Sequence, residues 1–400
     1  MNAQIPAKTV AFCLLSFRPD HPSGVERSLA ALMEGVRQLG HTPLVLAAGP
    51  AQAGDAAEPG LIRLSSVQLP RPATNDHVLA ALADPGPVVA EVRSVLAERG
   101  VDIVCWGDTL WGLGYLNAAP PGVRTALMVH KIRPDSDQRW HQALADASVV
   151  CPASVYLAQE GAQAGWDTSD WRTVPNALLM APHPVPEAQR ERLRREGPIR
   201  IVSRVEPAKG LAELVAAIPP GWNRPVELVL AEADFEFWPG MQADVITACR
   251  AAAERRPELI TVRPALSWRE VPPYLAGAAA TIISSTEPET FCFTAAEALS
   301  VGTPVISFDH GNVPLLAGPA GRAVALQEGA GALWAALEAL LADPAAYQAA
   351  AAAAPDQVAR YTPAAAASAL LAAAVSDPPR LGIASSRPNL GTVAAPPTGP

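Results

Sequence analysis

Short apolar segments alternate with longer amphipathic ones along most of this chain, and this alternation constrains the fold more than any other feature. The apolar segments have the length of single strands and are rich in branched residues, whereas the segments between them have the polar face of surface helices. Strands that alternate with helices form parallel sheets covered by helices on both faces. The sequence therefore predicts the α/β class.

The alternation occurs in two series of similar size, which predict two Rossmann-like domains. In the first, an expected strand over residues 9–17 leads through a glycine loop to an expected helix over 25–39. In the second, an expected strand over residues 199–203 leads through Arg204 to a helix that begins near Leu211. Further strands are expected at residues 43–47, 103–106, 124–129 and 148–151 in the first series, and at 226–231, 259–262, 280–285 and 304–308 in the second.

Shifts in composition mark the expected domain boundaries. Residues 178–198 contain four prolines and a charged stretch over 187–196, which suits a connection between domains. We expect an N-terminal domain over residues 1–185 and a C-terminal domain over 186–375, whose last helix is a candidate to cross back. Residues 376–400 are rich in Pro, Gly, Ser and Thr and are expected to form a disordered tail.

Charge and cysteine content exclude several classes of protein. Thirty basic residues against 39 acidic ones give a formal net charge of −9, which repels phosphate backbones, so no nucleic-acid partner is expected. The apolar stretch over residues 10–17 is one strand long, and no uninterrupted apolar run approaches the roughly 18 residues of a membrane helix, so no integral membrane segment is expected. Five cysteines without CxxC spacing indicate reduced core thiols in a cytoplasmic protein.

The segment over residues 282–307 holds the densest group of candidate functional residues. An expected strand there leads to Glu289 in a loop, and Glu297 follows eight residues later in a helix that begins near Phe293. Free amides at this helix start, near Phe293 and Thr294, can hold a phosphate or diphosphate, and the two carboxylates can bind hydroxylated groups on either side of it. The alternative is that Glu297 only complements the helix dipole and that Glu289 is a solvated loop acid.

Arg204 and Lys209 follow the first strand of the second series. Lysine occurs only at positions 8, 131 and 209, whereas the other 27 basic residues are arginine. A guanidinium and an ammonium at this strand end can offset the negative charge of a departing diphosphate. The alternative is a pair of exposed cations without a ligand.

Weaker candidates lie in the first series. Gly24, after the first strand, lets a ligand approach a helix start, with a plain tight turn as the alternative. His130 follows the expected strand over 124–129, where it can contact a sugar or serve the structure alone. The stretch from Asp135 to Asp137 resembles a metal-binding motif but follows no apolar strand, and no His/Cys spacing fits zinc, so no metal site is expected.

Taken together, these stretches resemble the family-four glycosyltransferases, which are retaining enzymes that depend on nucleotide sugars. The resemblance extends to about residue 375 and implies the GT-B fold, in which two Rossmann-like domains face each other across a cleft. The most specific part is similar to the family's E-x7-E motif, and another part to its phosphate-binding R-x4-KG motif. The matching stretches are Gly24-Val-Glu-Arg, Arg204-Val-Glu-Pro-Ala-Lys209-Gly210, and Glu289 to Glu297 followed by Gly302 and Pro304.

The resemblance implies transfer of a glycosyl group from a nucleotide diphosphate sugar, with retention at the anomeric carbon and no metal cofactor. It implies that Arg204 and Lys209 bind the diphosphate, that Glu297 binds the ribose, and that Glu289 and His130 meet the donor sugar. The expected catalytic residues are Glu289, Arg204, Lys209 and His130, and the expected donor site comprises Gly24, Arg204, Lys209, Glu289, Phe291, Cys292, Phe293, Thr294 and Glu297.

Two departures from the family pattern concern the donor sugar. The family's E-G-F-G is Glu289-Thr290-Phe291-Cys292 here, so two glycines on which the sugar would lie are replaced by residues with side chains. Where many members have Glu after a Gly-x-x-Pro stretch, this chain has Leu315, and no role is assigned to it. The class is unaffected, but the resemblance does not identify the sugar.

The acceptor is expected on the first domain, against Asp20, His21, Trp106, Asp108 and Trp111. Acids and indoles there suit a hydroxylated ring compound, including a cationic one. The opening residues 17–24 are similar to members that glycosylate aminocyclitols in antibiotic pathways, so aminoglycoside assembly in a GC-rich bacterium is a narrower hypothesis. A GT-B nucleotide-sugar epimerase and a noncatalytic sugar-nucleotide binding module stay open as alternatives.

Overall fold

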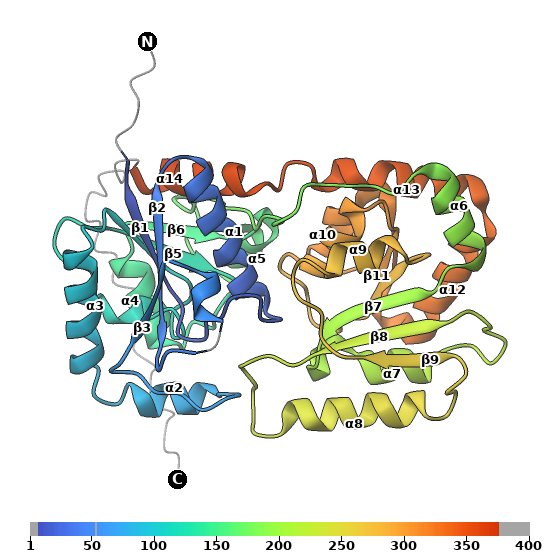
Figure 1. Cartoon of the computed structure of the whole chain (residues 1–400), viewed down its shortest axis with the longest axis horizontal. Coiled ribbons are helices and arrows are strands. Elements are labelled where there is room, and N and C mark those ends of the chain that lie inside the picture. The colour runs from blue at the N-terminus through green and yellow to red at the C-terminus, as the bar shows by residue number, and fades with distance from the viewer. Residues whose placement is uncertain (1–6, 53, 376–400) are drawn as a thin grey trace, which may run out of the picture.

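The computed structural model describes residues 7–52 and 54–375, which form two α/β halves joined by two crossings of the chain (Figure 1). Each half is built on parallel strands with helices around them. The predicted α/β class and the predicted pair of Rossmann-like halves are therefore confirmed. The tail expected over residues 376–400 lies outside the described residues.

The first half is built on one six-stranded parallel sheet. Its strands are β1 (Thr9–Cys13), β2 (Thr42–Ala48), β3 (Leu61–Leu64), β4 (Ile103–Trp106), β5 (Arg124–Val129) and β6 (Val149–Pro152), and its helices are α1 (Gly24–Gln38), α2 (Asn75–Ala81), α3 (Gly86–Glu98), α4 (Gln138–Asp146) and α5 (Val155–Gln163). The strand order is β3-β2-β1-β4-β5-β6. This order reverses between β1 and β4, the position at which doubly wound sheets bind ligands.

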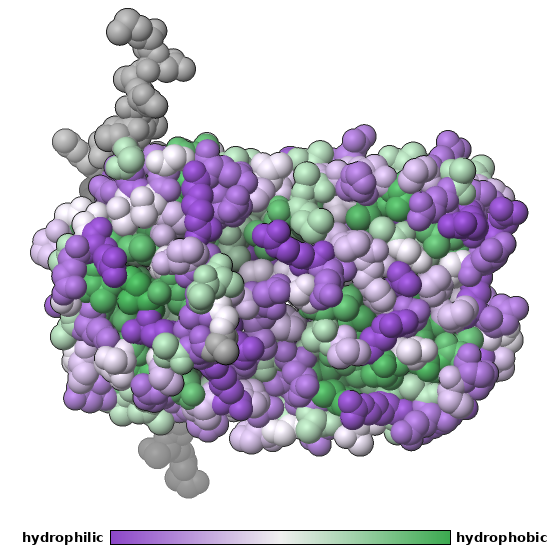
Figure 2. All heavy atoms as spheres, in the orientation of Figure 1, coloured by the Kyte–Doolittle hydropathy of each residue, from purple (hydrophilic) through white to green (hydrophobic). Residues whose placement is uncertain are grey.

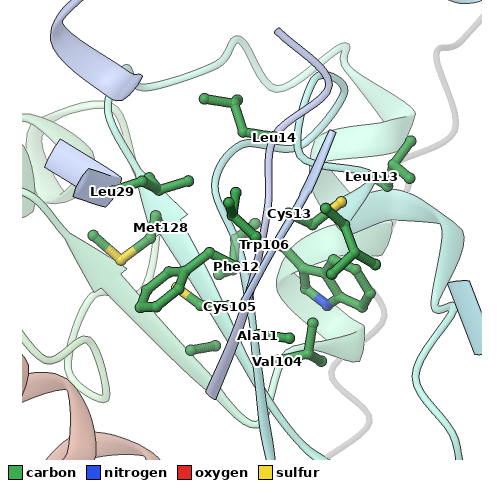
Figure 3. Close-up of a cluster of buried hydrophobic side chains, with 14 of the residues drawn as sticks. Ala11, Phe12, Cys13, Leu14, Leu29, Val104, Cys105, Trp106, Leu113 and Met128 are labelled. Atoms are coloured by element: carbon green, nitrogen blue, oxygen red, sulfur yellow. The ribbon is translucent and has the colours of Figure 1, made fainter. Parts of the chain in front are cut away.

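The central strands of this sheet are apolar along their length because helices cover both faces. The last four residues of β1 have no exposed surface, and no residue of β4 is more than 2% exposed. Figure 3 shows Phe12 and Cys105 from these strands in one cluster with Leu29 of α1 and Met128 of β5. This core fixes the carboxyl ends of β1 and β4, from which loops lead toward the second half.

The second half contains two three-stranded parallel sheets. Its strands are β7 (Ile199–Arg204), β8 (Val226–Ala231), β9 (Ile260–Arg263), β10 (Thr281–Ile283), β11 (Val305–Phe308) and β12 (Gly321–Val324), and its helices are α6 (Glu187–Glu196), α7 (Leu211–Ala216), α8 (Met241–Ala253), α9 (Val271–Ala276), α10 (Phe293–Ser300), α11 (Val313–Ala317), α12 (Gly329–Ala342) and α13 (Pro344–Val358). The orders are β7-β8-β9 and β10-β11-β12, and a parallel bridge between Ile199 and Ala280 joins them. The two sheets therefore continue one another.

The charged stretch that was expected to connect the domains forms helix α6, which packs against α13. Arg190 anchors this helix, because its buried guanidinium donates to the carbonyl oxygens of Ala278 at 2.7 Å and Val301 at 2.9 Å. The first connection is therefore confined to the segment before α6, and the charges of α6 belong to the second half.

The last helix, α14 (Pro363–Val375), leaves the second half and lies against α1 of the first (Figure 1). The approach is so close at Gly35 that a Cβ there would come within 1.9 Å of the Pro363 carbonyl oxygen. Residues 344–375 are long and apolar enough to cross a membrane by length and composition alone. They form two separate helices, α13 and α14, each of which buries one face against a different half.

Candidate active site

An ion pair between Lys209 and Glu289 lies at the carboxyl ends of β7 and β10. Lys209 Nζ is 2.7 Å from Glu289 Oε1, and both side chains are less than one-fifth exposed. Burial favours the neutral form of each group, but the attraction between them and their hydrogen bond prevail, so the pKa of Glu289 is lowered and that of Lys209 is raised. Both groups are charged at neutral pH, and Glu289 is not a solvated loop acid.

Two glycines allow the backbone to bring this pair together. Gly210, with φ of +58°, packs so closely on the end of β10 that a Cβ would lie 2.6 Å from the Ser284 carbonyl oxygen. Gly311, with φ of +67°, leaves the same clearance of 2.6 Å to the backbone nitrogen of Glu289. Both conformations strain any other residue, so the positions of Lys209 and Glu289 depend on them.

Arg204 ends β7 and adds a second positive charge to this spot. Its Nη2 donates to Glu206 Oε2 at 2.7 Å, and its side chain is one-third exposed. Its charge helps to lower the pKa of Glu289 and, by repulsion, works against the raised pKa of Lys209. The structure therefore brings both predicted cations close to one of the two predicted acids.

The starts of helices α1 and α10 meet between the halves. A Cβ built on Gly24, the first residue of α1, would lie 3.7 Å from the ring of Phe293, the first residue of α10. Each helix start has unpaired amide hydrogens and a partial positive charge. Together with the neighbouring Arg204 and Lys209, these two starts form a site suited to an anion.

Cys292 directly precedes α10 in a conformation that glycine adopts more readily. Its φ is +73°, and its side chain is half-buried. Burial and the charge of Glu289 raise the pKa of the thiol, which also feels the charges of Lys209 and Glu297. The protonated thiol therefore lies beside the anion site, where a glycine would leave open space.

Three further predicted donor residues hold α10 in place with their side chains. Phe291 is buried and packs edge-on against Phe293, with ring centroids 5.1 Å apart. The Thr294 hydroxyl donates to the Val202 carbonyl oxygen of β7 at 3.1 Å. Because these side chains are engaged within the protein, the predicted binding of an anion by Phe293 and Thr294 would use their backbone amides and stays a prediction.

Glu297 is buried within α10 and paired with Arg27 of α1. Arg27 Nη1 donates to both carboxylate oxygens, at 2.7 and 2.8 Å, and the two residues are only 9% and 4% exposed, respectively. The guanidinium also lies over the Phe293 ring, 5.4 Å from its centroid. Burial raises the pKa of Glu297 although Arg27 opposes the shift. Glu297 therefore does more than complement the dipole of its own helix.

Sequence reasoning did not single out Glu26 or Arg27, although both stand in the first glycine motif. Glu26 is 3% exposed, accepts a hydrogen bond from the Ser16 hydroxyl at 2.6 Å, and has one oxygen, Oε2, without a partner. Burial raises its pKa. The available signal was the position of two charged residues on the buried side of a helix start, where charge is costly unless it is paired.

His130 follows β5, and its Nε2 atom is buried without a hydrogen-bond partner. Burial lowers its pKa to about 4, against the attraction of Asp108, so the imidazole is neutral at physiological pH. Asp108 is itself held by the backbone amides of Leu110 and Trp111 and by Arg133 at 3.1 Å. A neutral ring with a free nitrogen can bind one ligand hydroxyl.

One predicted acceptor residue lies in the core of the first half. Trp106 is 2% exposed, and Figure 3 shows its indole inside the core of the first half. The reason is that β4 is a central strand covered on both faces, so a large side chain there faces helices rather than a ligand. Trp106 is therefore part of the core in this arrangement, and its contact with an acceptor stays a prediction.

Three of the other predicted acceptor residues, Asp20, His21 and Trp111, contact the second half. Asp20 accepts a hydrogen bond from the backbone amide of Trp268 at 2.6 Å, and the Trp268 indole donates to the His21 carbonyl oxygen at 2.6 Å. Trp111 packs edge-on against Phe235, with ring centroids 5.3 Å apart. These three residues therefore lie at the junction of the two halves and are engaged in contacts across it.

The segment after β8, residues 232–238, joins the two halves at this junction. Asp234 accepts from Arg18 at 3.0 Å to each carboxylate oxygen, and Phe235 forms a parallel bridge with Ala73. Figure 1 shows this segment reaching toward the loop before α2, and Figure 2 shows mainly hydrophilic side chains along the seam between the halves. Polar contacts of this kind can open and close.

The sequence from Asp135 to Asp137 serves as a helix start. Asp137 caps α4 by accepting from the backbone amides of Arg139 and Trp140, and Asp135 lies 3.2 Å from His141. Within residues 7–52 and 54–375, no three His, Cys, Asp or Glu side chains gather closely enough to hold a metal ion.

Two family models match the chain, one in each half. Residues 22–178 match the model described as Glycosyltransferase Family 4, and residues 187–357 match the model described as Glycosyl transferases group 1. The first range contains the start of α1, and the second contains both cations and both acids of the site. The chain therefore belongs to the family-four type of GT-B glycosyltransferases, enzymes that transfer a sugar from a nucleotide sugar.

Solved structures share the fold across most of the chain. Sucrose-phosphate synthase from Thermosynechococcus elongatus superposes with a TM-score of 0.72 at 18% identity, over 91% of this chain and 98% of that one. HepE of Anabaena, solved in complex with UDP, gives 0.68 at 18% identity over the same shares. AviGT4, which is involved in avilamycin A biosynthesis, gives 0.53 at 19% identity, over 92% and 96%. The likeness at these identities is one of fold, and no curated protein sequence matches this chain.

Proposed function

We propose that this glycosyltransferase moves a glycosyl group from a nucleotide diphosphate sugar to a hydroxyl of a small-molecule acceptor, with retention at the anomeric carbon. The observation that carries the proposal is the convergence of two helix starts with Arg204 and Lys209 between the halves, next to two carboxylates. A diphosphate is stabilised by such a positive environment, and hydroxylated groups on either side of it need acceptors of this kind.

In this proposal, the diphosphate lies at the start of α10, opposite the start of α1. Arg204 and Lys209 meet the negative charge that grows on the leaving diphosphate. Glu297 binds the ribose, and Glu289 binds the donor sugar on the other side. His130, neutral and with a free ring nitrogen, forms a further hydrogen bond with the sugar.

Front-side attack is supported by the state of the two carboxylates. Glu289 is paired with Lys209, and Glu297 is paired with Arg27. A carboxylate nucleophile would need free access to the anomeric carbon, and neither acid is free. The acceptor oxygen therefore bonds to the anomeric carbon on the face from which the diphosphate leaves, and a phosphate oxygen takes the acceptor proton as the sugar–phosphate bond breaks.

We propose a hydroxylated ring compound as the acceptor, with an aminocyclitol as the narrower candidate. AviGT4, a protein of similar fold, is involved in the biosynthesis of avilamycin A, which supports the test of antibiotic intermediates. The acids that would meet a cationic acceptor, Asp20 and Asp108, are already hydrogen-bonded within the protein. A cationic acceptor therefore requires Asp20 to release Trp268 as the halves open. We also propose a cytoplasmic location.

The test is to incubate the purified protein with a panel of nucleotide sugars and hydroxylated acceptors, and to analyse the products by mass spectrometry and NMR. The expected result is release of nucleoside diphosphate together with an acceptor that has gained one sugar in the donor's anomeric configuration. A changed sugar formed without an acceptor would indicate an epimerase, and donor binding without release would indicate a binding module. An inverted product would refute retention alone, and arrest of turnover by a chelator would refute the proposed metal-free reaction.

A further inference from the structure

Glu26 is a buried acid of the first half that the proposed reaction does not use. It is the third residue of α1 and is 3% exposed. The sequence from Ser23 to Glu26 has the spacing of a capping box, in which Glu26 would bind the backbone amide of Ser23. That amide donates instead to the His21 carbonyl oxygen at 2.7 Å. Glu26 therefore does not cap the helix, and its burial needs another explanation.

The carboxyl group of Glu26 is directed back toward the start of α1. Side chains of a helix tilt toward its N-terminus, and the Ser16 hydroxyl, which lies before the helix, donates to Glu26 Oε1 at 2.6 Å. The same helix start faces α10, where a Cβ on Gly24 would lie 3.7 Å from the Phe293 ring. The acid therefore belongs to the helix start at which the diphosphate is proposed to bind.

Opposing influences set the charge of Glu26. Burial raises its pKa, whereas the hydroxyls of Ser16 and Ser23, its own backbone amide and the charge of Arg204 oppose the shift. Arg204 faces Glu26 from the second half and is also bonded to Glu206 at 2.7 Å. The ionised form of Glu26 therefore depends in part on a cation that the diphosphate is proposed to use.

A bound diphosphate changes this balance in one direction. Its negative charge repels an ionised Glu26, and Arg204 then acts on the phosphates as well. We propose that Glu26 takes up one proton when the nucleoside diphosphate part of the donor binds, and releases it when the nucleotide leaves. The proton comes from the solvent and forms an O–H bond at Oε2, which has no partner, because Oε1 already accepts from Ser16. The inference rests on the proposed function and adds to it an acid whose charge depends on the donor.

This proton couples the affinity for the donor to pH. A buried neutral carboxyl costs less than a buried charge, and a neutral Glu26 no longer competes with the diphosphate for Arg204. As the pH rises, the proton is harder to obtain, so binding of the nucleotide weakens. The affinity should fall about tenfold for each unit by which the diphosphate raises the pKa of Glu26.

The test compares the parent protein with Glu26→Gln, which keeps the shape of the side chain and has no charge at any pH. Dissociation constants of the diphosphates of uridine, guanosine, adenosine and deoxythymidine are measured by calorimetry, and the tightest ligand is followed from pH 5 to pH 9. The two proteins should bind alike at pH 5, within about threefold, whereas Glu26→Gln should bind at least about tenfold more tightly at pH 9. Titration of the phosphates cancels in the ratio of the two proteins. A purely structural role of Glu26 predicts weaker binding by Glu26→Gln at every pH.

Two further variants identify the titrating group. Ser16→Ala removes the hydroxyl that donates to Oε1, so the pKa of Glu26 rises and the loss of affinity should begin at a higher pH. This variant keeps the acid and tests the inference even if Glu26→Gln does not fold. Glu160→Gln is the matched control, because burial also raises the pKa of Glu160 while the charge that faces it is that of Lys131. Its affinity relative to the parent should stay constant with pH.

The outcomes distinguish this inference from the proposed function. If none of the four nucleotides binds the parent at any pH, the proposed function fails and the inference fails with it. If one binds but the ratio of Glu26→Gln to the parent is constant from pH 5 to pH 9, or if Ser16→Ala leaves the pH dependence unchanged, Glu26 takes up no proton and the inference is refuted while the proposed function stands. An equal gain at high pH in Glu160→Gln would refute the assignment to Glu26 as well.

Discussion

Replacing Lys209 with Ala should remove most of the catalytic rate. The ammonium lies where the diphosphate is proposed to bind, and its side chain is only 18% exposed, so water does not replace the lost charge well. The loss of one such electrostatic partner of a transition state costs about 3–4 kcal/mol, which corresponds to a decrease in kcat of about 10²- to 10³-fold.

The same substitution also acts on stability, and the two effects must be separated. Glu289, which is 17% exposed, would lose its cation. Because the pair is not fully buried, we expect a cost of about 1–3 kcal/mol in the free energy of unfolding, below the range for completely buried pairs. Adding Glu289→Gln to Lys209→Ala should restore part of this stability without restoring turnover, since no buried charge is then left unpaired.

The assay measures release of nucleoside diphosphate at saturating donor, at a temperature where urea unfolding shows every variant to be folded. Lys8→Ala is the matched control, because Lys8 precedes β1 at the opposite end of the sheet from the site, and it should keep its full rate. Turnover of Lys209→Ala within about threefold of the parent would refute the assigned role, as would an equal loss in Lys8→Ala.

Three further predictions concern the backbone and the charges of the site. Cys292 has φ of +73°, so the free energy of unfolding in urea should be about 1 kcal/mol higher for Cys292→Gly than for Cys292→Ala. The reverse order would contradict the proposed backbone strain at this position. Gly311→Ala should lower turnover at least about tenfold, and it should lower the free energy of unfolding by about 1–2 kcal/mol more than Gly329→Ala does. A Cβ at Gly311 would meet the backbone of Glu289, whereas Gly329, which also has a positive φ, has open space around it. Equal effects of the two substitutions would show that the contact is unimportant. The pKa of Glu289 lies below its ordinary value of 4.5. The ionised carboxylate therefore stabilises the folded protein fully above pH 4.5, and this stabilisation is lost as the pH falls through the lower pKa of the folded state. The difference in unfolding free energy between the parent and Glu289→Gln should therefore shrink in acid, and a constant difference from pH 7 to pH 3 would refute this linkage.

The sequence predicted most strands closely, including the edge strands β6 and β9, each of which begins one residue after its predicted start. The strands over residues 103–106, 124–129 and 226–231 are found at their predicted bounds, because continuous apolar runs are typical of strands covered on both faces. The edge strands β3 and β12 were missed, since each is short and contains an arginine. The first strand was predicted to be too long, because the apolar residues after β1 are buried in a loop that resembles a strand by hydrophobicity alone.

The candidate site could be predicted where it depends on one half and not where it depends on both. The order of strand, loop and helix was enough to bring Lys209 and Glu289 to the same sheet edge, because parallel strands end together. The partner of Glu297 was not predictable in this way, since Arg27 reaches it only through the contact between the halves. For the same reason, sequence patterns gave no sign that Trp268 covers Asp20.

Helix α14 has a consequence for how this protein is made. The second half is inserted between α5 and α14, both of which belong to the first half by contact. During synthesis, the apolar side of α1 emerges from the ribosome first, and α14, the helix that covers it, is synthesised more than 300 residues later. The N-terminal half on its own would expose that surface, so we expect it to aggregate or to need a chaperone until residue 375 has emerged.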